Sequence, residues 1–231
     1  MLSFWCEKIP IYGIFIVISL LCGLVYGFFK LKKENVSKDH IALYFLIILA
    51  FSIIGGKLMT LITTYNESTT FLSAGLSSYG GAIGIIMGII YYEMINPHNK
   101  LFIKTAIMPL PLIYGVAKLG CFFAGCCYGM PYNGILSVTY PDGLNIPLFP
   151  IQLLESIVFI LLFILLQHIN KKHPKYIIET TIIVCAFAKF ILDFLRYIHL
   201  DQIISINQIV SLLFILLAAL STYKKWKKTT C

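Results

Sequence analysis

The sequence predicts an all-α, polytopic membrane protein with seven transmembrane helices. Of its 231 residues, 59% are hydrophobic and only 12% are charged, and the mean hydropathy is +0.88. Ordinary soluble domains carry about 25% charged residues, so this composition excludes that class. Apolar runs long enough to cross a bilayer, which needs roughly 17–25 residues, occur seven times along the chain.

The seven expected helices follow one another with short connections. They cover residues 11–29, 41–62, 77–95, 102–126, 150–169, 177–196 and 203–223. The first run is too long for the apolar part of a removable signal peptide and lacks a small-residue cleavage site, so we expect it to remain as a helix. No linker separates the runs and no repeat relates them, which predicts a single integral-membrane domain over residues 1–231.

The basic residues predict the orientation of these helices. They follow the first, third, fifth and seventh runs as Lys30, Lys32, Lys33 and Lys38, then Lys100 and Lys104, then Lys171, Lys172 and Lys175, then Lys224, Lys225, Lys227 and Lys228. The connections near 63–76, 127–149 and 197–202 contain no lysine or arginine. The positive-inside rule therefore places the N-terminus outside and the C-terminus in the cytoplasm. This topology explains most of the net charge of +8, so no nucleic acid partner is expected.

Polar residues are expected at one depth in the outward half of the membrane. Because a helix rises about 1.5 Å per residue, Lys57, Lys118 and Lys189 fall at a common level. The other helices place these polar residues near it: Tyr79, Gln152, Glu155, Ser205, Asn207 and Gln208. An ionisable residue inside a membrane usually faces a partner or a wet cavity, so the sequence predicts a cationic chamber that is open to the outside. A phospholipid phosphate is the nearest abundant anion that suits it.

Several of these residues also have a purely structural interpretation. A single lysine can extend its ammonium group to the interface, and we expect Arg196, close to a helix end, to do so. Asp193 can pair with Lys189 or Arg196 on its own helix. His199 can serve the chamber as a proton acceptor, although a solvated loop position is the favoured interpretation.

The glycines and cysteines favour close packing over metal chemistry. Glycines recur at four-residue spacing, which lets helix backbones approach closely in lipid: Gly23 and Gly27; Gly80, Gly84 and Gly88; Gly125 and Gly129. Cys121, Cys126 and Cys127 lie within seven positions, but no nearby histidine completes a four-ligand zinc site. A C-x-x-C redox motif is also missing from this segment, so we expect neither a metal nor a cofactor.

An ordered set of motifs resembles a known family. The motifs are "GGK", "SSYGG", "AKLGCFFAGCCYGMP", "FPIQLLES", "KFILDFLR" and "NQIVS", spread from about residue 55 to residue 211. Together they resemble the prolipoprotein diacylglyceryl transferases. The resemblance implies an enzyme of the bacterial cytoplasmic membrane that takes the diacylglyceryl group of phosphatidylglycerol. It joins this group by a thioether to the lipobox cysteine in the signal peptide of a preprolipoprotein and releases glycerol phosphate, without a cofactor.

The resemblance assigns roles by position. It implies catalytic roles for Lys118, Tyr79 and Lys189. It implies substrate binding by Lys57, Gly80, Gly81, Cys121, Gly125, Gly129, Gln152, Glu155, Arg196, Asn207 and Gln208. Lys118 stands where the family has the arginine of its G-R-x-G-N-F segment, and Lys57 and Lys189 also replace arginines. Lysine holds a phosphate as a point charge, without the bidentate fork of arginine.

Other positions depart from the family pattern as well. Cys121 replaces an asparagine, Cys126 a glutamate and Phe149 a histidine. Tyr79 stands where many members have a histidine that is proposed to help deprotonate the thiol. A tyrosine, with a pKa near 10, is a base only if neighbouring cations lower that pKa.

These departures leave two alternative functions open: a paralogue that modifies a different acceptor, and a non-catalytic lipid-binding or transport protein. Transport is disfavoured because few charged residues fall in the inner half of the helices.

Overall fold

The computed structural model describes residues 11–63, 78–97, 100–140 and 144–230, without the side chains of residues 63, 78, 79 and 228–230. The chain divides into two compact units. One contains Met1–Gly23 and Ile107–Cys231, and the other contains Leu24–Ala106. Helix α2 (Ile11–Lys33) contributes to both. Each unit is described by itself.

The described part of the chain confirms the all-α fold. Five helical segments are long and apolar enough to cross a membrane: Ile11–Lys33, Lys38–Ile62, Leu101–Phe123, Ile151–Lys172 and Ile206–Lys227. The third and sixth expected runs form the shorter helices α4 (Ser78–Ile95) and α8 (Ile177–Asp193). The protein is thus a multi-pass helical membrane protein.

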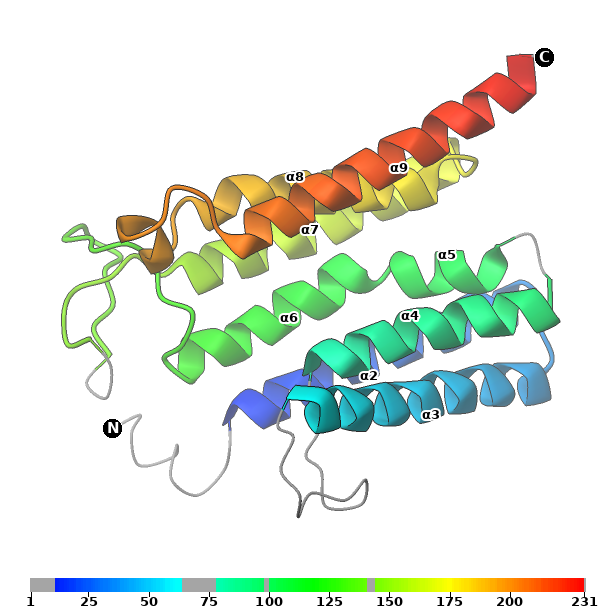
Figure 1. Cartoon of the computed structure of the whole chain (residues 1–231), viewed down its shortest axis with the longest axis horizontal. Helices are drawn as coiled ribbons and strands as arrows, with labels where there is room; N and C mark the ends of the chain where they lie inside the picture. The colour runs from blue at the N-terminus through cyan, green and yellow to red at the C-terminus, as the bar shows by residue number, and fades with distance from the viewer. Residues whose placement is uncertain (1–10, 64–77, 98–99, 141–143, 231) are drawn as a thin grey trace. The chain divides into compact units, whose positions relative to one another are not determined.

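In the Leu24–Ala106 unit, α3 (Lys38–Thr63) packs along α4, as Figure 1 shows. Their backbones approach so closely that a Cβ on Gly84 would overlap the Phe51 carbonyl, and one on Gly55 would overlap the Gly80 carbonyl. This is the close packing that the glycine spacing predicts. Beside it, the Tyr44 hydroxyl donates a hydrogen bond to the Phe102 carbonyl at 3.0 Å, at the start of α5 (Leu101–Ile107).

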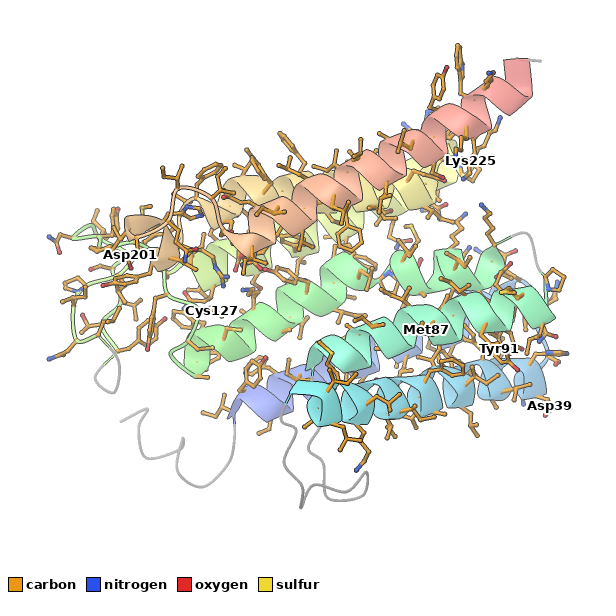
Figure 2. All side chains as sticks on the ribbon, in the orientation of Figure 1. Asp39, Met87, Tyr91, Cys127, Asp201 and Lys225 are labelled. Atoms are coloured by element: carbon orange, nitrogen blue, oxygen red, sulfur yellow. The ribbon has the colours of Figure 1, made fainter. Side chains whose placement is uncertain are left out.

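The second unit holds α6 (Leu110–Phe123), α7 (Ile151–Lys172), α8, the 3₁₀ turn η1 (Tyr197–Leu200) and α9 (Ile206–Thr230). Helix α6 packs on α7, and α8 packs on α7 and on α9, as Figure 1 shows. Between α8 and α9, the buried Glu179 carboxylate lies 2.5 Å from the Lys225 ammonium and accepts a hydrogen bond from Ser221 at 3.0 Å. Figure 2 shows Lys225 toward the C-terminal end of α9.

Two expected helices end earlier than the hydropathy pattern indicates. The fourth run is divided into α5 and α6 at Met108–Pro109, because Pro109 and Pro111 cannot donate backbone hydrogen bonds within a helix. Helix α6 then ends at Phe123, three residues before the expected end. Helix α8 ends at Asp193, so the segment around Arg196 lies outside the helix. Each early end leaves chemically active side chains in a connection.

Candidate active site

Glu155 lies at the centre of a cluster formed by three helices. Its fully buried carboxylate on α7 has one oxygen 2.8 Å from Lys118 Nζ of α6 and the other 2.6 Å from Lys189 Nζ of α8. The Lys118 contact is an ion pair without hydrogen-bond alignment, whereas Lys189 donates a hydrogen bond. The structure therefore brings together three residues that the sequence predicts at one depth. Both lysines turn toward a shared carboxylate and not toward lipid.

Tyr114 completes this cluster, although no sequence motif singles it out. Its hydroxyl donates a hydrogen bond to Glu155 at 3.0 Å. Its ring centroid lies 5.2 Å from Lys118 Nζ and 5.6 Å from Lys189 Nζ, distances at which the ring face attracts a cation. A signal was present in the sequence, since Tyr114 precedes Lys118 by four residues and so shares its helix face.

Asp193 forms a second centre at the C-terminal end of α8. Its carboxylate is fully buried. The groups around it are Lys189 Nζ at 3.4 Å, Arg196 Nη1 at 3.8 Å, His199 Nε2 at 3.4 Å, Asn207 Nδ2 at 3.4 Å, and the Ser205 hydroxyl, which donates a hydrogen bond. The expected pairing of Asp193 with Lys189 and Arg196 is confirmed. Because Lys189 also contacts Glu155, the two carboxylates belong to one network.

Cations outnumber carboxylates in the network. Three cations, Lys118, Lys189 and Arg196, face two carboxylates, Glu155 and Asp193. The Cys127 thiol, on which Lys118 and Arg196 also act, is a further acidic group beside these cations. The Nε and Nη2 atoms of Arg196 are buried and have no hydrogen-bond partner of good geometry within the described residues, although the guanidinium group also interacts with the Cys127 thiol. Buried guanidinium N–H groups are costly to leave unsatisfied. An anion bound here would lie beside three cations and would accept hydrogen bonds from these donors.

Arg196 and His199 correct two predictions. Arg196 was expected to extend to the interface, but its side chain is only 13% exposed. The reason is a backbone pairing that the sequence does not reveal. Arg196 forms an isolated antiparallel β-bridge with Gly129 of the α6–α7 connection, and Met130 N donates a hydrogen bond to the Leu195 carbonyl at 3.0 Å. His199 was expected in a solvated loop, but η1 folds it onto Asp193 and its side chain is 4% exposed.

The cysteines lie where α6 ends. Gly125 adopts φ +60°, Gly125 N donates to the Phe122 carbonyl at 3.3 Å, and Cys126 N donates to the Cys121 carbonyl at 3.1 Å. This pair of bonds is a Schellman C-cap, which favours glycine at the left-handed position. In the connection that follows, Cys127 accepts a hydrogen bond from Cys121, and this bond, together with the positive charges of Lys118 and Arg196, lowers the pKa of the Cys127 thiol to about 5.

Three predicted substrate-binding residues contact backbone atoms of the protein itself, two through hydrogen bonds and one through close packing. Gln152 Nε2 donates to the Cys126 carbonyl at 2.7 Å. Gln208 accepts from Ser205 N at 3.0 Å and donates to the Phe190 carbonyl at 3.5 Å. A Cβ on Gly129 would overlap the Phe149 carbonyl. These residues shape the connections that surround the charged network.

The remaining predicted residues belong to the Leu24–Ala106 unit and are described within it alone. Lys57 is half-buried on α3. A Cβ on Gly80 would overlap the Gly55 carbonyl, whereas one on Gly81 would make ordinary contact with Ser52 Oγ at 3.4 Å. Tyr79 lies in the first turn of α4, but its side chain lies outside the described residues.

The sequence is similar to known proteins over most of its length. The family model described as prolipoprotein diacylglyceryl transferase matches residues 1–223. The phosphatidylglycerol–prolipoprotein diacylglyceryl transferase 2 of Clostridium perfringens is 28% identical over 232 residues, which cover 94% of this chain and 90% of that protein. The corresponding enzyme of Clostridium tetani is 29% identical over 202 residues, covering 82% and 81%. That of Chloroherpeton thalassium is 26% identical over 239 residues, covering 94% and 88%.

Proposed function

Because the chain belongs to the prolipoprotein diacylglyceryl transferase family, we propose that it transfers the diacylglyceryl group of phosphatidylglycerol to the cysteine thiol of a prolipoprotein. The reaction releases glycerol phosphate. The three relatives described above, which bear this activity in their names, align with 82–94% of the chain. We further propose that both units act as one transferase domain in the bacterial cytoplasmic membrane, with seven spans, the N-terminus outside and the C-terminus in the cytoplasm.

The observation that carries this proposal is the positive network of Lys118, Lys189 and Arg196. A phosphodiester brings one negative charge to a site where three cations face two carboxylates. Its oxygens accept hydrogen bonds from the unsatisfied Nε and Nη2 atoms of Arg196. The single arginine thereby supplies the planar fork that the two lysines lack.

The proposed reaction is a nucleophilic displacement at the glyceryl carbon. The acceptor thiolate forms a C–S bond to that carbon, and the C–O bond to the phosphate breaks with its electron pair on oxygen. Charge accumulates on the leaving phosphate, where Lys118 and Lys189 stabilise it. Positioning supplies much of the remaining acceleration, because the reactants are held together. Glu155 and Asp193 keep the cations in place before substrate binds.

The acceptor side of the site rests on the family resemblance. We propose that Tyr79 takes the thiol proton or donates a hydrogen bond, that Lys57 adds positive charge, and that Gly80 and Gly81 let substrate approach the backbone of α4. We also propose that Asn207, whose Nδ2 donates a hydrogen bond to Asp193 at 3.4 Å, orients phosphate or ester oxygens. For Gln152 and Gln208 we propose an indirect role, which their hydrogen bonds to the backbone support.

A transfer assay with a labelled donor tests the proposal. The purified protein in lipid nanodiscs receives phosphatidylglycerol labelled in its headgroup glycerol and a lipobox peptide. Released labelled glycerol phosphate and the mass of the peptide thioether are both measured. We expect both products from the wild type and a loss of about 100-fold in Lys118→Ala, the order seen when one stabilising group is removed from a site. Lys32→Ala, at the exposed end of α2, is the control and retains activity.

The two readouts separate the alternatives. Glycerol phosphate without a peptide thioether indicates a different acceptor. Phospholipid binding without glycerol phosphate indicates a non-catalytic protein. Full transfer by Lys118→Ala would remove the central role assigned to this network.

A further inference from the structure

We propose that Cys121, Cys126 and Cys127 form a binding site for a soft d¹⁰ metal cation, Zn²⁺ or Cu⁺. Their three Sγ atoms all lie within 4.8 Å of one another. Zinc–sulfur bonds of about 2.3 Å place ligand sulfurs roughly 4 Å apart, so small side-chain rotations close the triangle on an ion. Thiolates select Zn²⁺ and Cu⁺ over hard cations such as Mg²⁺ and Ca²⁺.

The fold brings these thiols together in a way that their sequence spacing conceals. In the Schellman C-cap, Cys121 and Cys126 occupy the two positions whose side chains regularly meet across the helix end. The left-handed conformation of Gly125 closes that turn. Cys127 is also left-handed, with φ +58°, an uncommon conformation for a residue with a side chain. This second reversal returns the Cys127 sulfur to the other two.

The cysteine spacing disfavours a metal only because it offers no fourth ligand. A three-thiol site accommodates a metal when a water or another small ligand completes the coordination shell, as in zinc sites that keep an open position. Cys121 is buried, Cys126 is half-buried and Cys127 is exposed, so the triangle is open on one side. Figure 2 shows Cys127 where the α6–α7 connection leaves the end of α6. An ion therefore has a path to the sulfurs.

Surrounding contacts hold the triangle in place and balance its charge. The Cys126 backbone is fixed by the 2.7 Å hydrogen bond from Gln152. Three thiolates around a divalent ion leave one negative charge, and Lys118, one turn before Cys121, and Arg196 both act electrostatically on Cys127. These contacts orient the ligands from outside the first coordination shell. The bound ion would tie the start of the α6–α7 connection to the last turn of α6.

Metal retention tests the site without any measurement of transfer activity. The protein is purified in detergent under reducing, oxygen-free conditions, loaded with Zn²⁺ or Cu⁺, passed over a chelating resin and analysed for metal by mass spectrometry. We expect one retained equivalent of at least one of the two ions in the wild type. Cys121→Ser, Cys126→Ser and Cys127→Ser should each lower the affinity at least tenfold. Cys22→Ser and Cys185→Ser, which remove thiols outside the triangle, should retain the equivalent.

A second measurement uses only the wild-type protein, so it stands even if the serine variants do not fold. Zinc or copper loading should slow alkylation of Cys127 by iodoacetamide at least tenfold, followed by peptide mass spectrometry, and leave alkylation of Cys22 unchanged. The proposal is overturned if neither ion is retained, if a folded triple serine variant retains as much metal as the wild type, or if loading gives no protection. A disulfide within the triangle in protein isolated without oxygen also overturns it.

Discussion

At the scale of single residues, Glu155 controls the charge balance of the site. It is the shared counterion of Lys118 and Lys189, and its side chain is fully buried. Removal of one partner from a buried ion pair typically costs about 3–5 kcal/mol, because the remaining charge is left without compensation. Glu155→Gln removes the carboxylate that pairs with Lys118 and leaves Lys189 with Asp193, 3.4 Å away.

We therefore expect Glu155→Gln to lower the free energy of unfolding by about 3 kcal/mol or more, measured by thermal or denaturant unfolding in micelles. The matched control is Glu34→Gln, which breaks the exposed Lys30–Glu34 pair at 2.9 Å. An exposed pair contributes only about 0–1 kcal/mol. Equal effects of the two substitutions would contradict the buried counterion role of Glu155.

Gly125 is the second residue with a sharp expectation, because its φ of +60° sets the end of α6. A left-handed conformation costs a residue with a Cβ roughly 1–2 kcal/mol, and asparagine tolerates it better than alanine. A Cβ here would also lie 2.9 Å from Tyr140 Cδ1, and alanine and asparagine would both make this contact.

Gly125→Ala should accordingly destabilise the protein more than Gly125→Asn, by roughly 1 kcal/mol in unfolding experiments. The comparison isolates the backbone conformation from the contact with Tyr140. If alanine is tolerated as well as asparagine, the Schellman C-cap does not determine where the helix ends.

At the scale of elements, the packing of α3 on α4 depends on glycines that touch backbone. At Gly84 a Cβ would overlap the Phe51 carbonyl, and the two helices must separate to accept it. At Gly81, on the same helix, the nearest atom would be Ser52 Oγ at 3.4 Å, an ordinary contact. The two positions therefore form a matched pair.

We expect Gly84→Ala to lower the free energy of unfolding by about 1–3 kcal/mol, as overpacking of a tight contact does. Gly81→Ala should be neutral or stabilising by up to about 1 kcal/mol, since alanine is the better helix former. Thermal unfolding followed by helical circular dichroism measures both. A loss in Gly81→Ala as large as that in Gly84→Ala would show that the carbonyl contact is not the cause.

At this scale the sequence predicts helices well and their ends poorly. Hydropathy identifies the helical regions, and depth along the helices is enough to group Lys118, Glu155 and Lys189. The end of α6 depends on one left-handed backbone position, Gly125, which hydropathy does not encode. The burial of Arg196 depends on its pairing with Gly129, 67 positions earlier, and such a long-range contact leaves no local pattern.

At the scale of the whole molecule, the orientation in the membrane is the main open prediction. The lysine-rich connections alternate with connections that contain no lysine or arginine, which places residue 134 outside and the C-terminus in the cytoplasm. Green fluorescent protein fluoresces only when it folds in the cytoplasm, whereas alkaline phosphatase is active only outside it.

A fusion after residue 134 should therefore show phosphatase activity without fluorescence, and a fusion after residue 231 should fluoresce without phosphatase activity. A fusion after residue 35, in the first lysine-rich connection, serves as the cytoplasmic control. The opposite pattern at residues 134 and 231 would invert the topology and place the charged network near the cytoplasmic surface.

The pairing of Gly129 with Arg196 has a mechanical consequence. The Met130 and Tyr197 N–H groups donate hydrogen bonds across it, one on each side of the bridge. The segment that follows α6 and the segment that follows α8 are therefore paired antiparallel. One segment therefore cannot move away from the other unless these hydrogen bonds break. Because Arg196 lies in the segment after α8, a peptide that displaces the segment after α6 would also displace the Arg196 guanidinium group. The pairing thereby couples movement of the two connections at this end of the helices.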